Sequence, residues 1–158
     1  YVQKGSERFF VNPDMPSGFI EKFVASTVQC DDLLDSIKGK GAELIDVFAA
    51  DPQVKNNVLD NFRSKGYEIA SAAPGVNSAT AGGVNKGAAL LGMCERLGIT
   101  PDEAMAFGDA ENDAPMLRIA GLSFAMANGT EPCKLAAKAI APSNADDGVA
   151  QMINKYAF

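Results

Sequence analysis

An apolar run that ends at a glycine and opens into a carboxylate-rich turn is the feature that most constrains this chain. Ala106-Phe107-Gly108 leads directly into Asp109, and Asp113 follows four residues later at the start of a helix-like segment. Strands of parallel sheets are apolar on both faces, and ligands of such sheets gather at the carboxyl ends of the strands. We therefore predict a parallel α/β sheet in which Asp109 lies just past the end of a strand.

The oxygen atoms of this turn suit a metal ion. Asp109, Asn112 and Asp113 could together hold a hard cation such as Mg²⁺, which favours oxygen ligands and keeps places for water and phosphate. Acidic residues also begin many ordinary helices, so a plain helix start stays open as the alternative. A calcium loop of the EF-hand type is disfavoured, because Ala114 and Ala120 stand where that loop needs glycine and glutamate.

Composition excludes several other classes of protein. The 158 residues are 47% hydrophobic, which is typical of one globular domain or two small ones. The net charge of −6 argues against a nucleic-acid surface, and no stretch is long and apolar enough to span a membrane. The absence of histidine leaves carboxylates, lysine or a metal to do any chemistry. Three widely spaced cysteines without a C-x-x-C motif indicate reduced thiols and a cytoplasmic location.

From about Gly83 onward, helix-like and strand-like segments alternate, which is the pattern of a parallel α/β layer. The predicted segments are an amphipathic helix that carries Leu90, Met93, Cys94 and Leu97 and ends at Gly98, a capped turn over 100–103, a strand that ends at Gly108, a helix with Met116, Leu117 and Ile119, a strand over 122–127, a helix over 130–139, a short strand over 139–141 and a closing helix over 147–156.

The first half of the chain predicts a different, α+β arrangement. Its predicted segments are an early helix with Phe19, Ile20, Phe23 and Val24, a strand over 44–49, a helix that Asp51-Pro52 opens and that carries Val54, Val58, Leu59 and Phe62, and a hairpin of 67–73 and 76–81 around Pro74-Gly75. Ala81-Gly82-Gly83 is the best candidate for a hinge between the halves, and a plain surface turn is an equally good interpretation of it.

Lys86 stands just before the predicted amphipathic helix, where its ammonium group and the unpaired amides of a helix start favour anions. A lone lysine at such a position is usually only solvated. Here, however, the turn after Gly108 and the loop around Asn128 follow the next two predicted strands. Parallel strands with right-handed crossovers bring such loops to one edge of the sheet. We therefore predict an anion site beside the cation site.

Four short motifs occur in order in the second half. They are V-N-K-G-x-A-L from Val84, G-D-x-x-N-D-x-x-M-L from Gly108, A-M-x-N from Ala125 and N-x-D-D-G-V-A from Asn144. Together they resemble the haloacid dehalogenase superfamily, and specifically its Cof-type sugar-phosphate phosphatases. The resemblance implies an α/β fold in which residues 82–158 form the C-terminal part of a Rossmann-like parallel core. It also implies that residues 1–81 form part of an α+β cap that selects the substrate.

The resemblance further implies a Mg²⁺-dependent phosphomonoester hydrolase that acts on a small phosphorylated metabolite such as a sugar phosphate. Asp109 would bind Mg²⁺, and Asp113 would support the metal site and the catalytic Lys86. Lys86 would neutralise the substrate phosphate. Asn112 and Asn128 would contact the phosphate or a nearby substrate oxygen.

The chain departs from the family pattern in one large respect. The family attacks phosphate with an aspartate in an N-terminal D-x-D-G-T motif, and these 158 residues contain no such motif. We therefore expect the chain to be the C-terminal part of an enzyme, inactive alone, with an N-terminal segment as its partner. Two alternatives stay open, namely a non-catalytic module that binds anions or a partner, and a fragment of a phosphosugar mutase.

Overall fold

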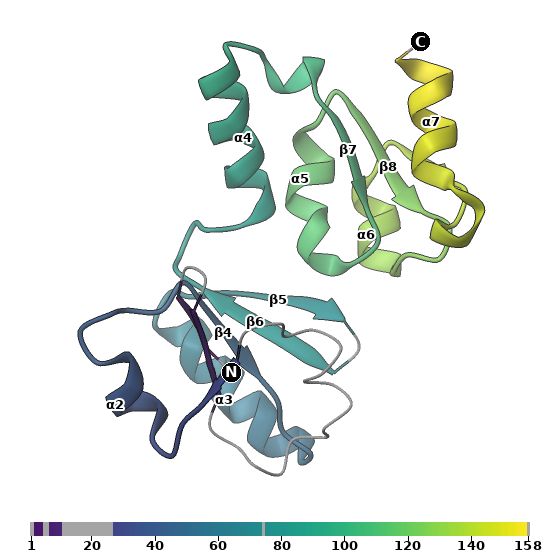
Figure 1. The fold of residues 1–158 in the computed structure, drawn as a ribbon. Helices are drawn as coiled ribbons and strands as arrows, with labels where there is room; N and C mark the ends of the chain where they lie inside the picture. Colours follow the sequence, from purple (N-terminus) through teal and green to yellow (C-terminus); the bar gives the residue numbers. More distant parts are fainter. Residues whose placement is uncertain (1, 5–6, 11–26, 74, 158) are drawn as a thin grey trace. The chain divides into compact units, whose positions relative to one another are not determined.

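The structure is a computed structural model that describes residues 2–4, 7–10, 27–73 and 75–157 (Figure 1). The chain divides into two compact units, one of Tyr1–Ile69 with Val76–Gly82 and one of Ala70–Gly75 with Gly83–Phe158. The early helix predicted around Phe19 to Val24 lies outside the described residues. No described helix has both the length and the apolar composition needed to cross a membrane.

A six-stranded sheet occupies the first part of the chain, with the strand order β3-β2-β1-β4-β6-β5. Its strands are β1 (Val2–Lys4), β2 (Glu7–Phe10), β3 (Thr27–Gln29), β4 (Leu44–Val47), β5 (Glu68–Ala73) and β6 (Val76–Thr80). The pair β2 and β3 is parallel, whereas β1 pairs antiparallel with β2 and β4, and β4 pairs antiparallel with β6. This confirms the predicted strand at 44–49 and the two strands that flank Pro74-Gly75.

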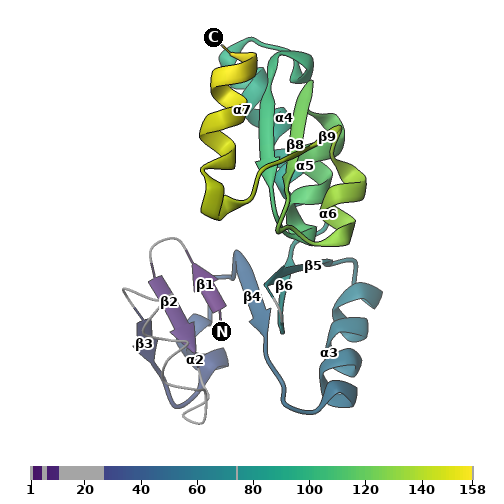
Figure 2. The same ribbon diagram turned by 90° about the vertical axis from the view of Figure 1, so that its right-hand side faces the viewer.

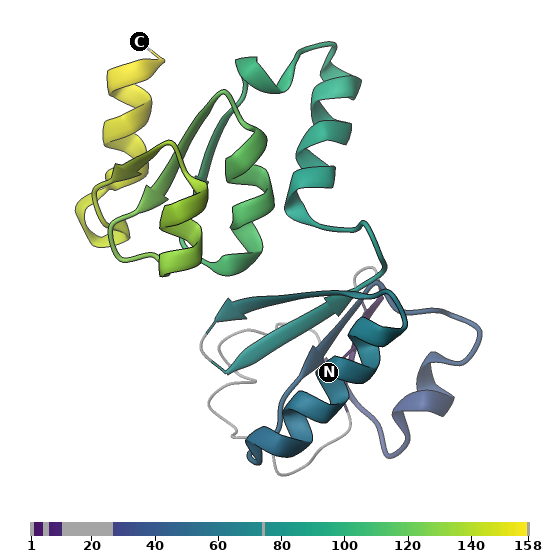
Figure 3. The same ribbon diagram turned by 180° about the vertical axis from the view of Figure 1, so that it is seen from behind.

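The described helices of this part of the chain are α2 (Leu33–Ile37) and α3 (Pro52–Ser64). The carboxylate of Asp51 accepts a hydrogen bond of 2.8 Å from the Gln53 amide, and Pro52 occupies the first turn. Leu59 is 3% exposed, and Figure 3 shows α3 lying beside β4 and its neighbours. The helix predicted to open at Asp51-Pro52 is therefore confirmed.

A three-stranded parallel sheet, in the order β7-β8-β9, forms the centre of the second unit. Its strands are β7 (Met105–Gly108), β8 (Leu122–Met126) and β9 (Ala139–Ala141). The helices are α4 (Lys86–Leu97), α5 (Ala114–Ile119), α6 (Glu131–Ala136) and α7 (Gly148–Tyr156), with 3-10 turns η1 (Pro101–Glu103), η2 (Glu111–Asp113) and η3 (Asn144–Asp146). The predicted alternation from Gly83 onward is thus confirmed.

Apolar side chains fill both faces of this sheet. Figure 2 shows α5 and α6 on one side and α7 on the other. On the α5 and α6 side, Ala106, Ala125 and neighbouring residues of the helices form a buried cluster. On the α7 side, Phe124, Met126 and Ala141 form a second buried cluster, against which Phe107 and other partly buried residues pack. Coverage of both faces explains why the strands have almost uninterrupted apolar sequences.

The apolar stripe predicted for α4 is only partly buried. Cys94 is 2% exposed, whereas Met93 and Leu97 are 54% and 64% exposed. The packed face of α4 passes through Gly87, where a Cβ would lie 3.0 Å from the backbone of Pro115 in α5. Because α5 has six residues and α4 has twelve, α5 covers only part of the stripe that the sequence predicts.

Candidate functional site

Parallel pairing brings the loops that follow the three strands of the second unit to one edge of the sheet. Gly108 is in register with Ala125, and Met126 with Ala141. Asp109 directly follows β7, Asn128 comes two residues after β8, and Asn144 comes three residues after β9. The predicted convergence of polar loops is therefore present.

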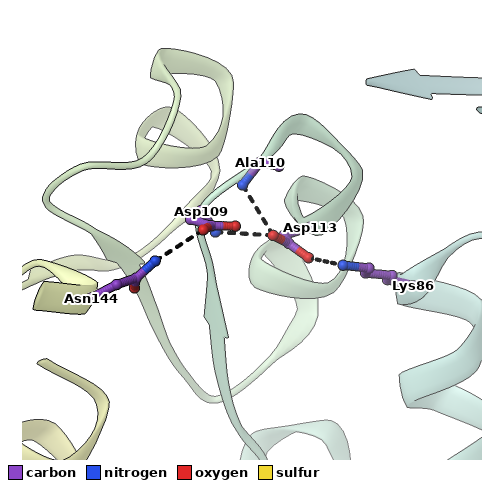
Figure 4. A network of polar contacts seen from close by, with 5 residues as sticks. All are labelled: Lys86, Asp109, Ala110, Asp113 and Asn144. Atoms are coloured by element: carbon purple, nitrogen blue, oxygen red, sulfur yellow. Dashed lines mark hydrogen bonds and ion pairs between the residues drawn. The ribbon is translucent and has the colours of Figure 1, made fainter. Parts of the chain in front are cut away.

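Asp113 is the buried anchor of the site, with an exposed fraction of 4%. Its Oδ2 accepts hydrogen bonds from the backbone N–H of Asp109 at 2.9 Å and of Ala110 at 3.1 Å (Figure 4). Gly108 makes room for this carboxylate, because a Cβ there would lie 2.9 Å from Asp113 Cγ and closer still to Asp113 Cβ. The buried position of Asp113 therefore requires a residue without a Cβ at position 108.

Lys86 completes the environment of Asp113. Its Nζ donates to Asp113 Oδ1, and the lysine side chain is 49% exposed while that of Asp113 is 6% exposed. Asn85 places Lys86 at the start of α4, because the Asn85 side chain accepts a hydrogen bond of 3.0 Å from the Ala88 amide. One ammonium and two amides compensate for the burial of the carboxylate, and about half of the lysine side chain is exposed to solvent.

Asp109 has a different environment, because it is exposed. Its Oδ2 accepts a hydrogen bond of 3.1 Å from Asn144 Nδ2, and its backbone oxygen accepts one of 2.8 Å from the Thr130 amide. The loop after β8 approaches closely, since a Cβ on Gly129 would lie 3.1 Å from the Cα of Asp109. The backbone and side chain of Asp109 are therefore held by two different loops.

The two predicted asparagine contacts differ in their surroundings. Asn128 is exposed, and its Oδ1 accepts a hydrogen bond of 3.0 Å from the Asn144 amide. Asn112 is half-buried within η2, and its side chain makes no hydrogen bond to any residue that the structure describes. The motifs that we quoted from the sequence contain Asn144, but we assigned no role to it. Its place shortly after a strand end was the available signal.

Cys133 is fully buried in the core cluster that contains Ala125 and Leu117. Burial raises the pKa of the Cys133 thiol, and the negative charges of Asp113 and Asp109 raise it further. The thiol is therefore protonated at neutral pH and serves as a small apolar side chain. Cys94 is also buried and free, so both residues serve the packing of the second unit.

The donor atoms fit part of a Mg²⁺ site. Across the described residues, no three His, Cys, Asp or Glu side chains gather as a metal-binding group. Mg²⁺ is usually held by one or two carboxylates together with water and phosphate oxygens, so the exposed carboxylate of Asp109 suits it. Asp113 Oδ2 is taken by two amides and Oδ1 by Lys86. Asp109 is therefore the more available of the two predicted carboxylates.

Comparisons with known proteins identify the family of this chain. Residues 9–153 match the haloacid dehalogenase-like hydrolase family. The chain is 39% identical over 107 residues to a 5-amino-6-(5-phospho-D-ribitylamino)uracil phosphatase of Bacillus subtilis, a match that covers 67% of this chain and 43% of the relative. It is 49% identical over 72 residues to a phosphoglycolate phosphatase of Methanopyrus kandleri, which covers 46% of this chain and 31% of that relative.

A solved structure of a subclass IIB sugar phosphatase superimposes with a TM-score of 0.73 at 25% identity and covers 90% of this chain and 55% of the other. The matches therefore span less than half of each of the two curated relatives and about half of the solved structure. They confirm the α/β fold class and the resemblance that the four motifs carry. The chain belongs to the haloacid dehalogenase-like hydrolase family.

Proposed function

We propose that the protein containing this chain is a Mg²⁺-dependent phosphomonoester hydrolase of a small phosphorylated metabolite such as a sugar phosphate. The observation that carries the proposal is the fixed arrangement of Lys86, Asp113 and Asp109 at the carboxyl ends of parallel strands. The names of the two curated relatives and of the sugar phosphatase structure support the same class of activity.

Lys86 is proposed as the catalytic cation that binds the substrate phosphate. Its side chain is half-exposed and its ammonium group is held by a buried carboxylate, so the position of the charge is set before substrate arrives. A preorganised positive charge stabilises the charge that develops on a phosphoryl group during transfer. The single contact with Asp113 leaves further N–H donors of the ammonium for phosphate oxygens.

Asp109 is proposed as the main protein ligand of Mg²⁺ on this chain. When bound, the metal would offset negative charge on the substrate phosphate. Asp113 contributes a second negative charge next to Asp109 and holds the Asp109 amide. Direct ligation by Asp113 stays a prediction, and it would use the remaining lone pair of Oδ1 beside Lys86.

Asn112 and Asn128 are proposed as contacts to the phosphate or to a nearby substrate oxygen. The side-chain amide of Asn112 within η2 has no hydrogen-bond partner among the residues that the structure describes, which supports its role, since an amide can both donate and accept. For Asn128, the carbonyl oxygen is used by Asn144 while the exposed NH₂ group can still donate to a substrate.

The attacking carboxylate is assigned to a polypeptide that carries the D-x-D-G-T motif, because the 158 residues lack it. That polypeptide would be the N-terminal partner of this chain and would form an aspartyl-phosphate. Residues 1–81 are proposed as the cap that selects the substrate, and residues 82–158 as part of the catalytic core. The buried free thiols of Cys94 and Cys133 support a reducing, cytoplasmic environment.

Complementation tests this proposal. The chain is mixed with a separately made N-terminal polypeptide that carries the motif, and phosphate release from sugar phosphates is measured with Mg²⁺ or with EDTA. We expect hydrolysis only with Mg²⁺, and a loss of about 100-fold in kcat/KM for Lys86→Ala. The matched control is Lys155→Ala on α7, which should hydrolyse substrate like the unmodified chain.

Hydrolysis no greater than that of Lys86→Ala would contradict the proposal. If the unmodified chain then still bound vanadate, a phosphate mimic, the result would favour a non-catalytic anion-binding module. Formation of a phosphosugar isomer instead of free phosphate would identify phosphoryl transfer between sugars, which is the mutase alternative.

A further inference from the structure

We infer that Asn144 is a positioning residue for the carboxylate of Asp109, and that Asn128 in turn positions Asn144. The inference rests on the proposed function, in which Asp109 holds Mg²⁺. It assigns to the loop after β9 a role in the site that the sequence motifs alone did not indicate.

The first step is the contact between Asn144 and Asp109, which are 35 residues apart in the chain. Asn144 Nδ2 donates to Asp109 Oδ2 at 3.1 Å, and Figure 4 shows the two side chains pointing toward each other. The Asp109 backbone is already held by the Thr130 amide, so Asn144 adds control of the side chain itself.

The second step is that Asn144 is itself held in place. Its backbone N–H donates to Asn128 Oδ1 at 3.0 Å. Ser143 Oγ accepts a hydrogen bond of 3.1 Å from the Ala145 amide and donates one of 2.8 Å to Asp146 Oδ2, which organises η3. Contacts of this kind fix the loop from both sides, so the Asn144 amide has a defined direction.

The loop also closes tightly against the start of α7. A Cβ on Gly148 would lie 2.7 Å from the carbonyl carbon of Pro142 and closer still to its oxygen. The Gly148 amide donates to the Ser143 oxygen at 3.2 Å. The segment that carries Asn144 is thus packed and hydrogen-bonded at both of its ends.

The chemistry of the donor explains why an amide suits this position. A neutral N–H group orients one carboxylate oxygen without cancelling the charge, so Oδ1 of Asp109 keeps its full capacity for a cation. Asp113 shows the contrast, because an ammonium group and two amides occupy its oxygens. Groups that orient a metal ligand in this way commonly change metal affinity or activity by about 10-fold to 100-fold when removed.

Paramagnetic broadening by Mn²⁺, used as a probe in place of Mg²⁺, tests the inference without any assay of activity. ¹H–¹⁵N spectra of the full chain are recorded with the N-terminal polypeptide present while Mn²⁺ is added. In the unmodified chain, the amide signals of Asp109 and Ala110 should broaden first. Asn144→Ala should need about 10-fold more Mn²⁺ for the same broadening, and Asn128→Ala should shift it in the same direction by less.

Asn154→Ala on α7 is the matched control, since Asn154 is exposed and lies outside the site. Its titration should coincide with that of the unmodified chain, and the thermal midpoints of all variants in EDTA should agree within a few degrees. Equal Mn²⁺ requirements for Asn144→Ala and the unmodified chain would overturn this inference alone. Absence of broadening near Asp109 in the unmodified chain would overturn the metal-binding role of Asp109 in the proposed function, and the inference with it.

If Asn144→Ala failed to fold, Asn128→Ala would decide the question. It leaves the Asn144 side chain in place and removes only the acceptor of its backbone amide. An unchanged Mn²⁺ requirement in a folded Asn128→Ala variant would contradict the second step, and a raised requirement would support it.

Discussion

The two sheets of this protein bring polar residues together in different ways. In the parallel sheet β7-β8-β9, Asp109, Asn128 and Asn144 come from three separate loops and meet at one edge. In the largely antiparallel sheet, Asp46 and Ser78 meet because they are direct partners on neighbouring strands. In a parallel sheet, polar residues that are distant in sequence therefore converge in the loops beyond the strand ends. In an antiparallel sheet, such residues meet as partners on neighbouring strands.

Glycines serve two purposes in this protein, and each unit contains both kinds: a Cβ on Gly82 of the first unit would also lie 2.5 Å from a backbone oxygen, and Gly83 and Gly98 of the second unit have positive φ angles and open space. Gly39, Gly41 and Gly66 of the first unit have positive φ angles and open space where a Cβ would lie, so they serve turns. Gly108 and Gly148 of the second unit have other atoms within 3.0 Å of that position. At Gly108 and Gly148 the backbone thus approaches other atoms closely, and both positions adjoin the site.

The largest effect is expected from Gly108→Ala, which should disrupt the close approach of Gly108 to Asp113 in the site. Its Cβ would overlap Asp113, and overpacking of this kind costs about 3 kcal/mol of unfolding free energy. Gly92→Ala in α4 is the control, since nothing lies within 4 Å of the added carbon, and it should stabilise the chain by about 0.5–1 kcal/mol. Urea unfolding measures both, and equal effects would refute the close approach at Gly108.

A smaller effect is expected from a pair of helix-cap substitutions, one in each unit. Asp51→Ala removes the acceptor of the Gln53 amide at the start of α3, and Asn85→Ala removes the acceptor of the Ala88 amide at the start of α4. Each should cost about 1 kcal/mol. Hydrogen exchange should show faster opening of α3 in the first variant and of α4 in the second. Equal acceleration of both helices in each variant would show that the two units open as one.

The smallest effect is expected at Asp46, and it concerns pH. Burial raises the pKa of the Asp46 carboxyl above 3.8, while the hydrogen bond from Ser78 opposes the rise. The native state therefore holds this proton more tightly than the unfolded chain does, so the stabilisation is present below about pH 4 and is lost as pH rises through the folded-state pKa. Asp46→Asn, which keeps a neutral side chain, should gain stability relative to the unmodified chain between pH 4 and pH 7.

Urea unfolding at the two pH values measures this difference. Asp31→Asn, at an exposed position, is the control and should show a smaller change with pH than Asp46→Asn. A difference at Asp46 that does not vary between pH 4 and pH 7 would show that the carboxyl titrates in the same way in the folded and unfolded chain.

Local sequence patterns predicted most elements of the second unit. The glycine after Leu97 adopts the left-handed conformation, with φ of 68°, at the end of α4. Thr100 and Glu103 pair through a hydrogen bond of 2.8 Å from the Thr100 amide. These signals act within a few residues, so they could be recognised without knowledge of the fold. The strands β1 to β3 were not predicted, because short strands are defined by their pairing partners rather than by local sequence.

The sequence predicted which residues belong to the candidate site better than it predicted the contacts between them. Spacing and motifs pointed to Lys86, Asp109 and Asp113, but they did not show that Asp113 is buried while Asp109 is exposed. They placed Asn144 shortly after a predicted strand, but they did not show which residue its side chain contacts. Its role follows from a hydrogen bond to Asp109 across 35 residues, and such a contact depends on the order of strands in the sheet.

The sequence by itself determined the alternation of elements, the parallel class of the second unit and the side chains available for chemistry. Helical periodicity, helix caps and apolar strands are encoded within a few neighbouring residues, so they can be recognised without knowledge of the tertiary structure. Only the tertiary structure decided which carboxylate is enclosed by Lys86 and two amides and which one is left open toward solvent. That choice depends on the packing of α4 and of the loop after β9 around the end of β7, where Lys86 binds the carboxylate of Asp113 and Asn144 binds that of Asp109.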